Sequence, residues 1–145
     1  MKTIIICSSA AFYRHVNQIA DELETLGFKT VVPLDCRRMK KTGNYDVSVV
    51  KTWYKNPNDF HKKAFYINDH FKEIENGDIV LAVNDEKHNY QGYIGPNVII
   101  EMGLAYYLKK PIYVLNPVDS EMPTYEEVHG LGSTIINGDL SKIKP

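Results

Sequence analysis

Short runs of apolar residues recur along the chain, separated by longer stretches in which apolar residues lie three or four positions apart. The first run, TIIIC at residues 3–7, is rich in β-branched side chains. Continuous runs of this kind are typical of strands that are covered on both faces. Four further strands are expected at residues 28–33, 78–84, 111–116 and 133–137.

The stretches between these runs have the periodicity of helices. Residues 14–27 carry apolar side chains at helical spacing, and Gly27 is suited to end that helix. A longer helix is expected over residues 56–77, with Pro57 in its first turn. Its apolar stripe consists of Phe60, Ala64, Ile67, Phe71 and Ile74. Two more helices are expected over residues 97–110 and 124–130.

Strands separated by helices favour a parallel sheet that is covered on both sides. The expected fold is therefore α/β: a three-layer, doubly wound, flavodoxin- or Rossmann-like sheet of about five mainly parallel strands. We expect a single domain over residues 1–145. Ligands bind such sheets beyond the carboxyl ends of the strands. Residues 34–56 have no clear period, and their length suggests an active-site loop or lid.

The composition, with 43% hydrophobic and 24% charged residues and a formal net charge of −1, is that of a soluble globular protein. No basic cluster stands out, so nucleic acid is not expected as a partner. No apolar run approaches the roughly 18 residues of a membrane span, and residues 1–12 lack a convincing signal peptide. Cys7 and Cys36 are too few for a disulfide framework or a metal cluster. We expect a cytoplasmic protein without a membrane partner.

Several well-known chemistries do not fit the end of the first strand. A cysteine-phosphatase loop needs its arginine one position closer to the cysteine than Arg14 is to Cys7, so Cys7 is interpreted as a small core residue. A receiver domain would need acids where Ser8 and Ser9 stand. The dinucleotide motif and the P-loop are absent. The histidines show no metal-ligand spacing and are interpreted as surface residues, so neither a metal nor a cofactor is expected.

Ser8 and Ser9 lie where the first strand meets the first helix. A helix N-terminus favours anions through its free amides and its dipole, so these hydroxyls could hold a phosphate or a sugar hydroxyl. They could equally cap the first helix. The sequence leaves both interpretations open.

Glu101 lies within residues 92–111, the longest mostly apolar stretch of the chain. Burying a carboxylate costs several kcal/mol unless partners compensate. A helix that starts near Asn97 would place Glu101 near its first turn, at the ligand edge of the sheet and on the same face as Asn97 and Ala105. A carboxylate that is partly desolvated but reachable suits a nucleophile. The alternative is a favourable partner for the helix dipole.

A more specific pattern surrounds this glutamate. Asn68-Asp69 precedes the third strand, Asp78 opens it, and a turn over residues 95–97 leads to Glu101-Met102-Gly103 and then to Lys109-Lys110-Pro111. In this order and spacing, residues 1–116 resemble the nucleoside 2-deoxyribosyltransferase superfamily. That superfamily includes the 2′-deoxynucleoside 5′-monophosphate N-glycosidases.

The resemblance implies that Glu101 attacks C1′ of a deoxyribose and forms a glycosyl-enzyme ester through an oxocarbenium-like transition state. It implies that Asp69 is the acid that assists at the sugar and base, in the same cavity as Glu101. The substrate-binding residues expected on this basis are Ser8, Ser9, Asn68, Tyr93, Gly95 and Asn97. Since family members are commonly dimers or larger, a homodimer or higher homo-oligomer is expected.

The chain departs from the family pattern in two places. Transferases usually carry an aspartate six residues before the nucleophile, where this chain has Gly95, and tend to have a tyrosine in the first strand, where it has isoleucines. The monophosphate glycosidases lack that aspartate and bind phosphate with a serine-containing loop, which residues 7–12 could imitate. Tyr90, Tyr93 and Trp53 could stack on a base or simply pack.

The function expected from these residues is cleavage or transfer of the N-glycosidic bond of a 2′-deoxynucleoside or its 5′-monophosphate. The partner is then a small nucleoside or nucleotide, and the protein is an N-glycosidase or a deoxyribosyltransferase. The alternative is a catalytically silent domain of the same fold that binds or senses a nucleotide, which the departures above favour.

Overall fold

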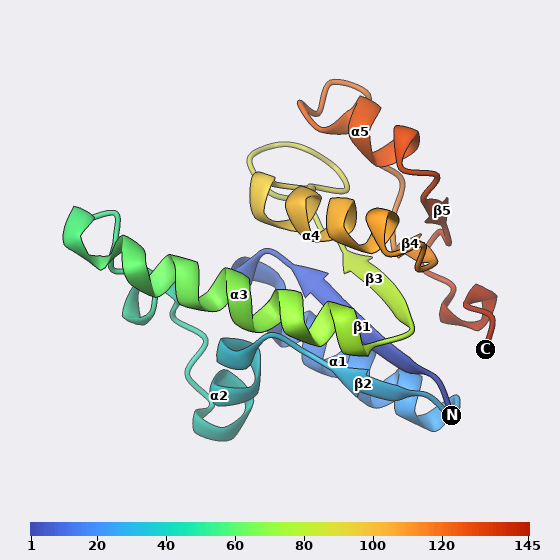
Figure 1. Cartoon of the computed structure of the whole chain (residues 1–145), viewed down its shortest axis with the longest axis horizontal. Coiled ribbons are helices and arrows are strands. Elements are labelled where there is room, and N and C mark those ends of the chain that lie inside the picture. The colour runs from blue at the N-terminus through green and yellow to red at the C-terminus, as the bar shows by residue number, and fades with distance from the viewer.

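A computed structural model describes all of residues 1–145 and shows a central sheet between two layers of helices (Figure 1). The strands are β1 (Thr3–Ser8), β2 (Lys29–Val31), β3 (Ile79–Val83), β4 (Ile112–Val114) and β5 (Thr134–Ile135). All neighbouring strands are parallel, in the order β2-β1-β3-β4-β5. This is the strand order of flavodoxin-like doubly wound folds. The expected three-layer α/β fold with five parallel strands is confirmed.

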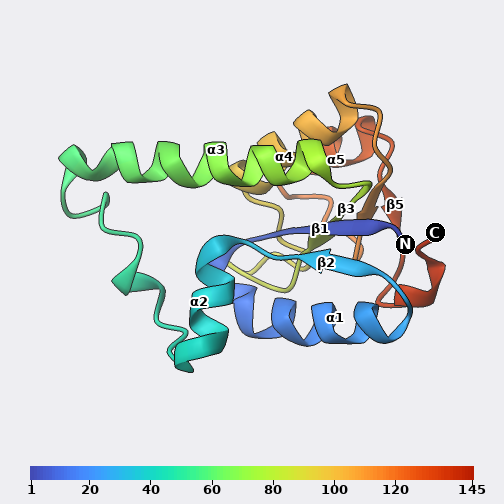
Figure 2. The same cartoon turned by 60° about the horizontal axis from the view of Figure 1, so that its bottom comes forward.

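The helices cover both faces of this sheet. They are α1 (Tyr13–Thr25), α2 (Leu34–Thr42), α3 (Phe60–Asn76), α4 (Pro96–Tyr107) and α5 (Tyr125–Gly130), with short 3₁₀ turns η1 (Ala10–Phe12), η2 (Val47–Val49), η3 (Pro57–Asp59) and η4 (Leu140–Lys142). Figure 2 shows α1 on one face of the sheet and α3, α4 and α5 on the other. None of these helices combines the length and the apolar character that a membrane crossing requires.

Each central strand contributes to two separate cores, because successive side chains of a strand point to opposite faces. Ile4 and Ile6 of β1 belong to the core beneath α1, which we call the α1-side core. Ile5 and Cys7 of the same strand belong to the core beneath α3, α4 and α5, the α4-side core. The continuous apolar run at the start of the chain therefore supplies both layers.

The structure corrects the expectation that residues 34–56 are irregular, because residues 34–42 form α2. Four of its nine residues are Arg or Lys, and only Asp35, Cys36 and Met39 are buried, so its apolar period is too short to stand out. Its ends carry the expected signals: Pro33 precedes the first residue, and Gly43 follows the last with φ of 72°.

Lys110 and Asp78 hold the end of α3 in place. The Lys110 Nζ donates to the carbonyl oxygens of Ile74 and Glu75, each at 2.6 Å, and so satisfies free carbonyls at the helix terminus. The Asp78 carboxylate accepts a hydrogen bond of 2.8 Å from the backbone N–H of Thr3. Together these contacts hold the end of α3 beside β1. Side chains from α3 and β1 are therefore neighbours.

Candidate functional site

A cavity of about 460 Å³ opens at the carboxyl end of β1. Its walls come from Ser8 and Ser9, from residues within 50–54, from α3, from Lys87, His88 and Tyr93, and from the first turns of α4. The chain leaves β1 and its neighbour β3 toward opposite faces of the sheet, so the cavity lies at the topological switch point. This is the place where doubly wound sheets bind ligands.

Two buried acids line this cavity, Asp35 with 7% and Glu101 with only 4% of its surface exposed. Asn97, one turn earlier in α4, donates a hydrogen bond of 2.9 Å to Glu101 Oε1. The other oxygen, Oε2, lies 3.8 Å from Nε2 of His70. Burial raises the pKa of Glu101, an effect only partly offset by His70, Cys7, Lys63 and Asn97. Because α4 begins at Pro96, Glu101 lies in the second turn of the helix. The helix dipole acts mainly on charges in the first turn, so it does not account for Glu101.

His70 is also buried, with 5% of its surface exposed, which corrects the interpretation of the histidines as surface residues. Its Nδ1 lies 2.8 Å from Glu73 Oε2, and Glu73 Oε1 accepts a hydrogen bond of 3.0 Å from Arg37. Burial by itself lowers the pKa of His70, but Glu73 and Glu101 outweigh it and raise that pKa. A protonated His70 therefore places positive charge beside Glu101.

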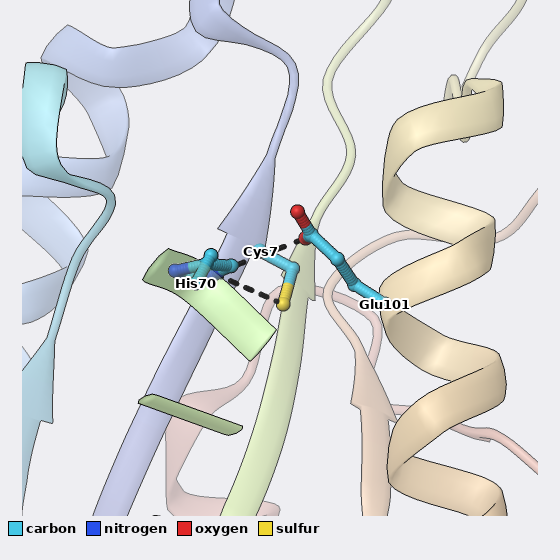
Figure 3. Close-up of side chains that lie close together, drawn as sticks. All are labelled: Cys7, His70 and Glu101. Carbon is cyan, nitrogen blue, oxygen red and sulfur yellow. Dashed lines mark hydrogen bonds and ion pairs between the residues drawn. The ribbon is translucent and has the colours of Figure 1, made fainter. Parts of the chain in front are cut away.

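Cys7 completes this buried group from β1. Its Sγ lies 3.5 Å from Nε2 of His70, and the side chain is 0% exposed. Burial raises its pKa well above the usual value, and the negative charge of Glu101 raises it further. The thiol is therefore neutral and inert as a nucleophile when no cation is present. Figure 3 shows Cys7, His70 and Glu101 pointing toward one another from β1, α3 and α4.

Three lysines, Lys51, Lys63 and Lys87, line the cavity, and none of them forms an ion pair. Burial lowers the pKa of each, and the charge of Lys51 lowers the pKa of the other two further. Lys63 donates to Asn97 Oδ1 at 2.9 Å, and Lys87 donates to the Ser9 hydroxyl at 2.8 Å. Mutually repelling, unpaired cations favour an anionic ligand between them.

Ser8, the last residue of β1, and Ser9, which follows it, do not cap a helix with their side chains. Ser9 is the N-cap residue of η1 without a side-chain capping bond, and the residue before α1 is Phe12. The Ser8 hydroxyl donates to the carbonyl oxygen of Ser9, and the Ser9 hydroxyl accepts from Lys87. Of the two interpretations left open by the sequence, side-chain capping is not observed, and both serines line the cavity.

Trp53 and Tyr93 line the cavity, whereas Tyr90 does not and packs instead against the α4-side core. Trp53 is only 7% exposed, and its ring centroid lies 6.3 Å from that of Tyr66, which also faces the cavity. The Lys63 Nζ lies 5.6 Å from the Trp53 ring centroid, and the Lys87 Nζ lies 5.4 Å from that of Tyr93. The walls therefore combine aromatic faces with cations.

The structure separates the expected site residues into two groups. Ser8, Ser9, Tyr93, Gly95, Asn97 and Glu101 all line the cavity. Asn68 and Asp69 do not, so the expectation that Asp69 shares the cavity of Glu101 is not met. Each residue of a helix is rotated by about 100° from the one before. Because His70 faces the sheet, Asp69 is turned to the side and Asn68 points to solvent.

The residues that the sequence interpretation missed are Lys51, Lys63, Tyr66, His70 and Lys87. A signal for two of them was present in α3, since Lys63 and His70 follow the helical spacing of one face together with Ile67 and Ile74. The expected apolar stripe put Phe60 and Ala64 on that face instead. Both are exposed, because the first turns of α3 extend past the edge of the sheet (Figure 1).

No known protein-family model matches this chain, and no curated protein does. Among solved structures it is similar to a 2-deoxyribosyltransferase from the psychrotolerant bacterium Bacillus psychrosaccharolyticus, at 18% sequence identity and a TM-score of 0.51. The similarity covers 83% of this chain and 76% of that chain. That enzyme is described as a biocatalyst for the synthesis of antiviral and antitumoral nucleosides. At this identity the similarity shows a shared fold.

Proposed function

We propose that this protein cleaves or transfers the N-glycosidic bond of a 2′-deoxynucleoside 5′-monophosphate, with Glu101 as nucleophile. The observation that carries the proposal is a buried carboxylate that opens on a cavity at the switch point of the sheet, with one oxygen held by Asn97. The fold shared with a 2-deoxyribosyltransferase supports the same reaction class.

In the proposed reaction, Oε2 of Glu101 forms a bond to C1′ of the sugar while the C1′–N bond breaks. The base leaves with the bonding electrons and takes up a proton from water. Water or a second base then attacks C1′ and releases the carboxylate. The positive charge of His70 keeps Glu101 ionised for the first step, since burial alone would favour the neutral acid.

The three cavity lysines support the monophosphate rather than the free nucleoside. Lys51 and Lys87 have no carboxylate partner, and Lys87 already orients the hydroxyl of Ser9. A phosphate would accept charge-assisted hydrogen bonds from these groups and relieve their mutual repulsion. Trp53 and Tyr93 offer aromatic surface for the base.

The test is the release of free base, measured by chromatography, from each deoxynucleoside and each 5′-monophosphate. We expect release from monophosphates, a fall of about 10³-fold or more in Glu101→Gln, and no change in Glu126→Gln, which alters an exposed glutamate of α5. The Glu101→Gln protein should be at least as stable as the wild type at neutral pH, because a buried charge is removed. Release that persists in Glu101→Gln would contradict the proposal.

A second function, nucleotide binding without catalysis, is favoured by one observation. Asp69, the expected second acid, lies outside the cavity, and the place beside Glu101 is taken by His70. Isothermal titration with the same monophosphates separates the two proposals. Binding without base release from any of them would establish the silent domain and exclude the enzyme.

We further propose that the chain acts as a single domain and assembles as a homodimer or higher homo-oligomer. Support comes from large apolar side chains of α3 and α4 that lie outside the cavity: Phe65 is 56% exposed and Tyr107 81%. Contiguous apolar patches on a protein surface often mark a contact between proteins. Analytical ultracentrifugation should give a mass above that of one chain, and Tyr107→Lys should lower it.

A further inference from the structure

Cys7, His70 and Glu101 bring three different donor atoms together at the end of β1 (Figure 3). The Cys7 Sγ lies 3.5 Å from His70 Nε2, and His70 Nε2 lies 3.8 Å from Glu101 Oε2. The three ligand atoms all lie within 4.8 Å of one another. The proposed glycosidic chemistry uses the carboxylate but gives no role to the thiol.

Two of these separations, from Sγ to Nε2 and from Nε2 to Oε2, are close to those of a tetrahedral zinc site. Zinc binds sulfur at about 2.3 Å, imidazole nitrogen at about 2.0–2.1 Å and carboxylate oxygen at about 2.0–2.2 Å. At tetrahedral angles those bonds place neighbouring donor atoms about 3.4–3.6 Å apart. The two measured distances lie within about half an ångström of this range, which small side-chain rotations would close.

The groups around the three side chains orient them as the surroundings of a metal site do. Glu73 holds Nδ1 of His70 at 2.8 Å and is itself held by Arg37 at 3.0 Å, so Nε2 is left to face Cys7 and Glu101. Asn97 occupies Oε1 of Glu101 and leaves Oε2 free toward His70. A carboxylate behind a histidine ligand is the usual arrangement in zinc proteins.

Charge supplies a separate reason for a cation at this position. The three side chains are 0%, 5% and 4% exposed, so a thiolate and a carboxylate here have little water around them. A divalent cation would favour both anions and release their protons on binding. Glu101 also lines the cavity, from which water could reach the remaining coordination position.

We propose that Cys7, His70 and Glu101 form a binding site for one borderline-soft divalent cation, for which Zn²⁺ fits best. Mg²⁺ and Ca²⁺ do not fit, because both require oxygen ligands and the site offers one thiol and one imidazole. The metal would engage the carboxylate that attacks the sugar in the proposed reaction, so the metal-bound form would be inactive as a glycosidase. The site itself does not depend on that reaction.

The test uses the full chain after treatment with a chelator, titrated with Co²⁺ as a spectroscopic substitute for Zn²⁺. We expect one equivalent to bind, with a thiolate-to-cobalt charge-transfer band that Zn²⁺ abolishes and an excess of Mg²⁺ leaves unchanged. Cys7→Ser should lose the band. Cys36→Ser should keep it, because Cys36 is equally buried but lies in α2, away from His70 and Glu101.

His70→Asn and Glu101→Gln should each weaken Zn²⁺ binding at least tenfold in a competition titration with a chelating dye. Both variants leave the core residue Cys7 unchanged. Glu73→Gln should weaken it about 10–100-fold through His70. Absence of the band from the wild type, or its persistence in Cys7→Ser, would overturn the proposal. Because no substrate is present in these measurements, failure of the proposed glycosidic reaction would leave their outcome unaffected.

Discussion

The two cores of this protein share the same strands and differ in chemistry. The α1-side core consists of apolar side chains and Cys36. The α4-side core is just as tightly buried along most of its length, but at the carboxyl end of β1 it passes into the cluster of Cys7, His70 and Glu101. The α1-side core therefore holds no part of this cluster, whereas the α4-side core combines stability with a reactive group.

The difference in chemistry between the two cores arises within single strands. Ile6 and Cys7 are consecutive residues of β1, both 0% exposed, and they point to opposite faces. A closed apolar layer beneath β1 gives a fixed base on which the other face can hold a buried acid despite its cost. We infer that neither core tolerates a polar substitution. Truncating a side chain should lower activity only if that side chain belongs to the α4-side core.

The largest expected effect comes from truncating one fully buried side chain in each core. Leu23→Ala in α1 and Met102→Ala in α4 should each lower the free energy of unfolding by about 2–5 kcal/mol, measured by urea denaturation. Met102 directly follows Glu101, so only Met102→Ala should also lower base release and weaken Co²⁺ binding. An equal loss of activity in folded Leu23→Ala would show that the two cores are coupled.

A smaller effect is expected at the contact that fixes α3 to the end of α4. Lys110→Met removes the donor to the carbonyls of Ile74 and Glu75 and should cost about 1.5 kcal/mol of unfolding free energy. Lys109→Met is the matched control, because Lys109 is exposed and should change stability by less than about 0.5 kcal/mol. If the two variants lower the free energy of unfolding equally in a urea titration, Lys110 does not anchor α3.

The cationic wall of the cavity should show a change in binding without a change in stability. Lys51→Met removes one charge-assisted contact to a phosphate and should raise KM for a deoxynucleoside 5′-monophosphate about tenfold. Lys55→Met, an exposed lysine four residues later, should leave KM unchanged. If both lysines behave alike, the lysines of the cavity do not hold the phosphate.

The smallest expected effect is a shift of the pH dependence. Protonated His70 lowers the pKa of Glu101, which burial raises. In His70→Asn that positive charge is gone, so Glu101 should ionise only at higher pH and the acid limb of base release should move upward. Rates measured against pH in the presence of a chelator test this, with His129→Asn in α5 as control. If the acid limb of the rate curve stays at the same pH or moves to lower pH, His70 carries no positive charge beside Glu101.

The order of elements was open to prediction because it depends on local patterns. Isoleucine and valine runs form strands wherever they are buried, and the helices between them follow from residues spaced by three and four. The one missed helix, α2, is short and highly charged, so its period did not stand out even though Pro33 and Gly43 mark its ends. Glu101 was also found from sequence, because a lone acid in an apolar stretch is locally conspicuous.

The partners of Glu101 were decided only by the tertiary structure. A shift of one residue along α3 turns a side chain by about 100°, so the sequence pointed to Asp69 while packing against β1 placed His70 in the site. Cys7, His70 and Glu101 come from three elements that are distant in sequence and carry no shared spacing. A sequence pattern fixes what each segment forms; which side chains meet depends on how the segments pack around the sheet.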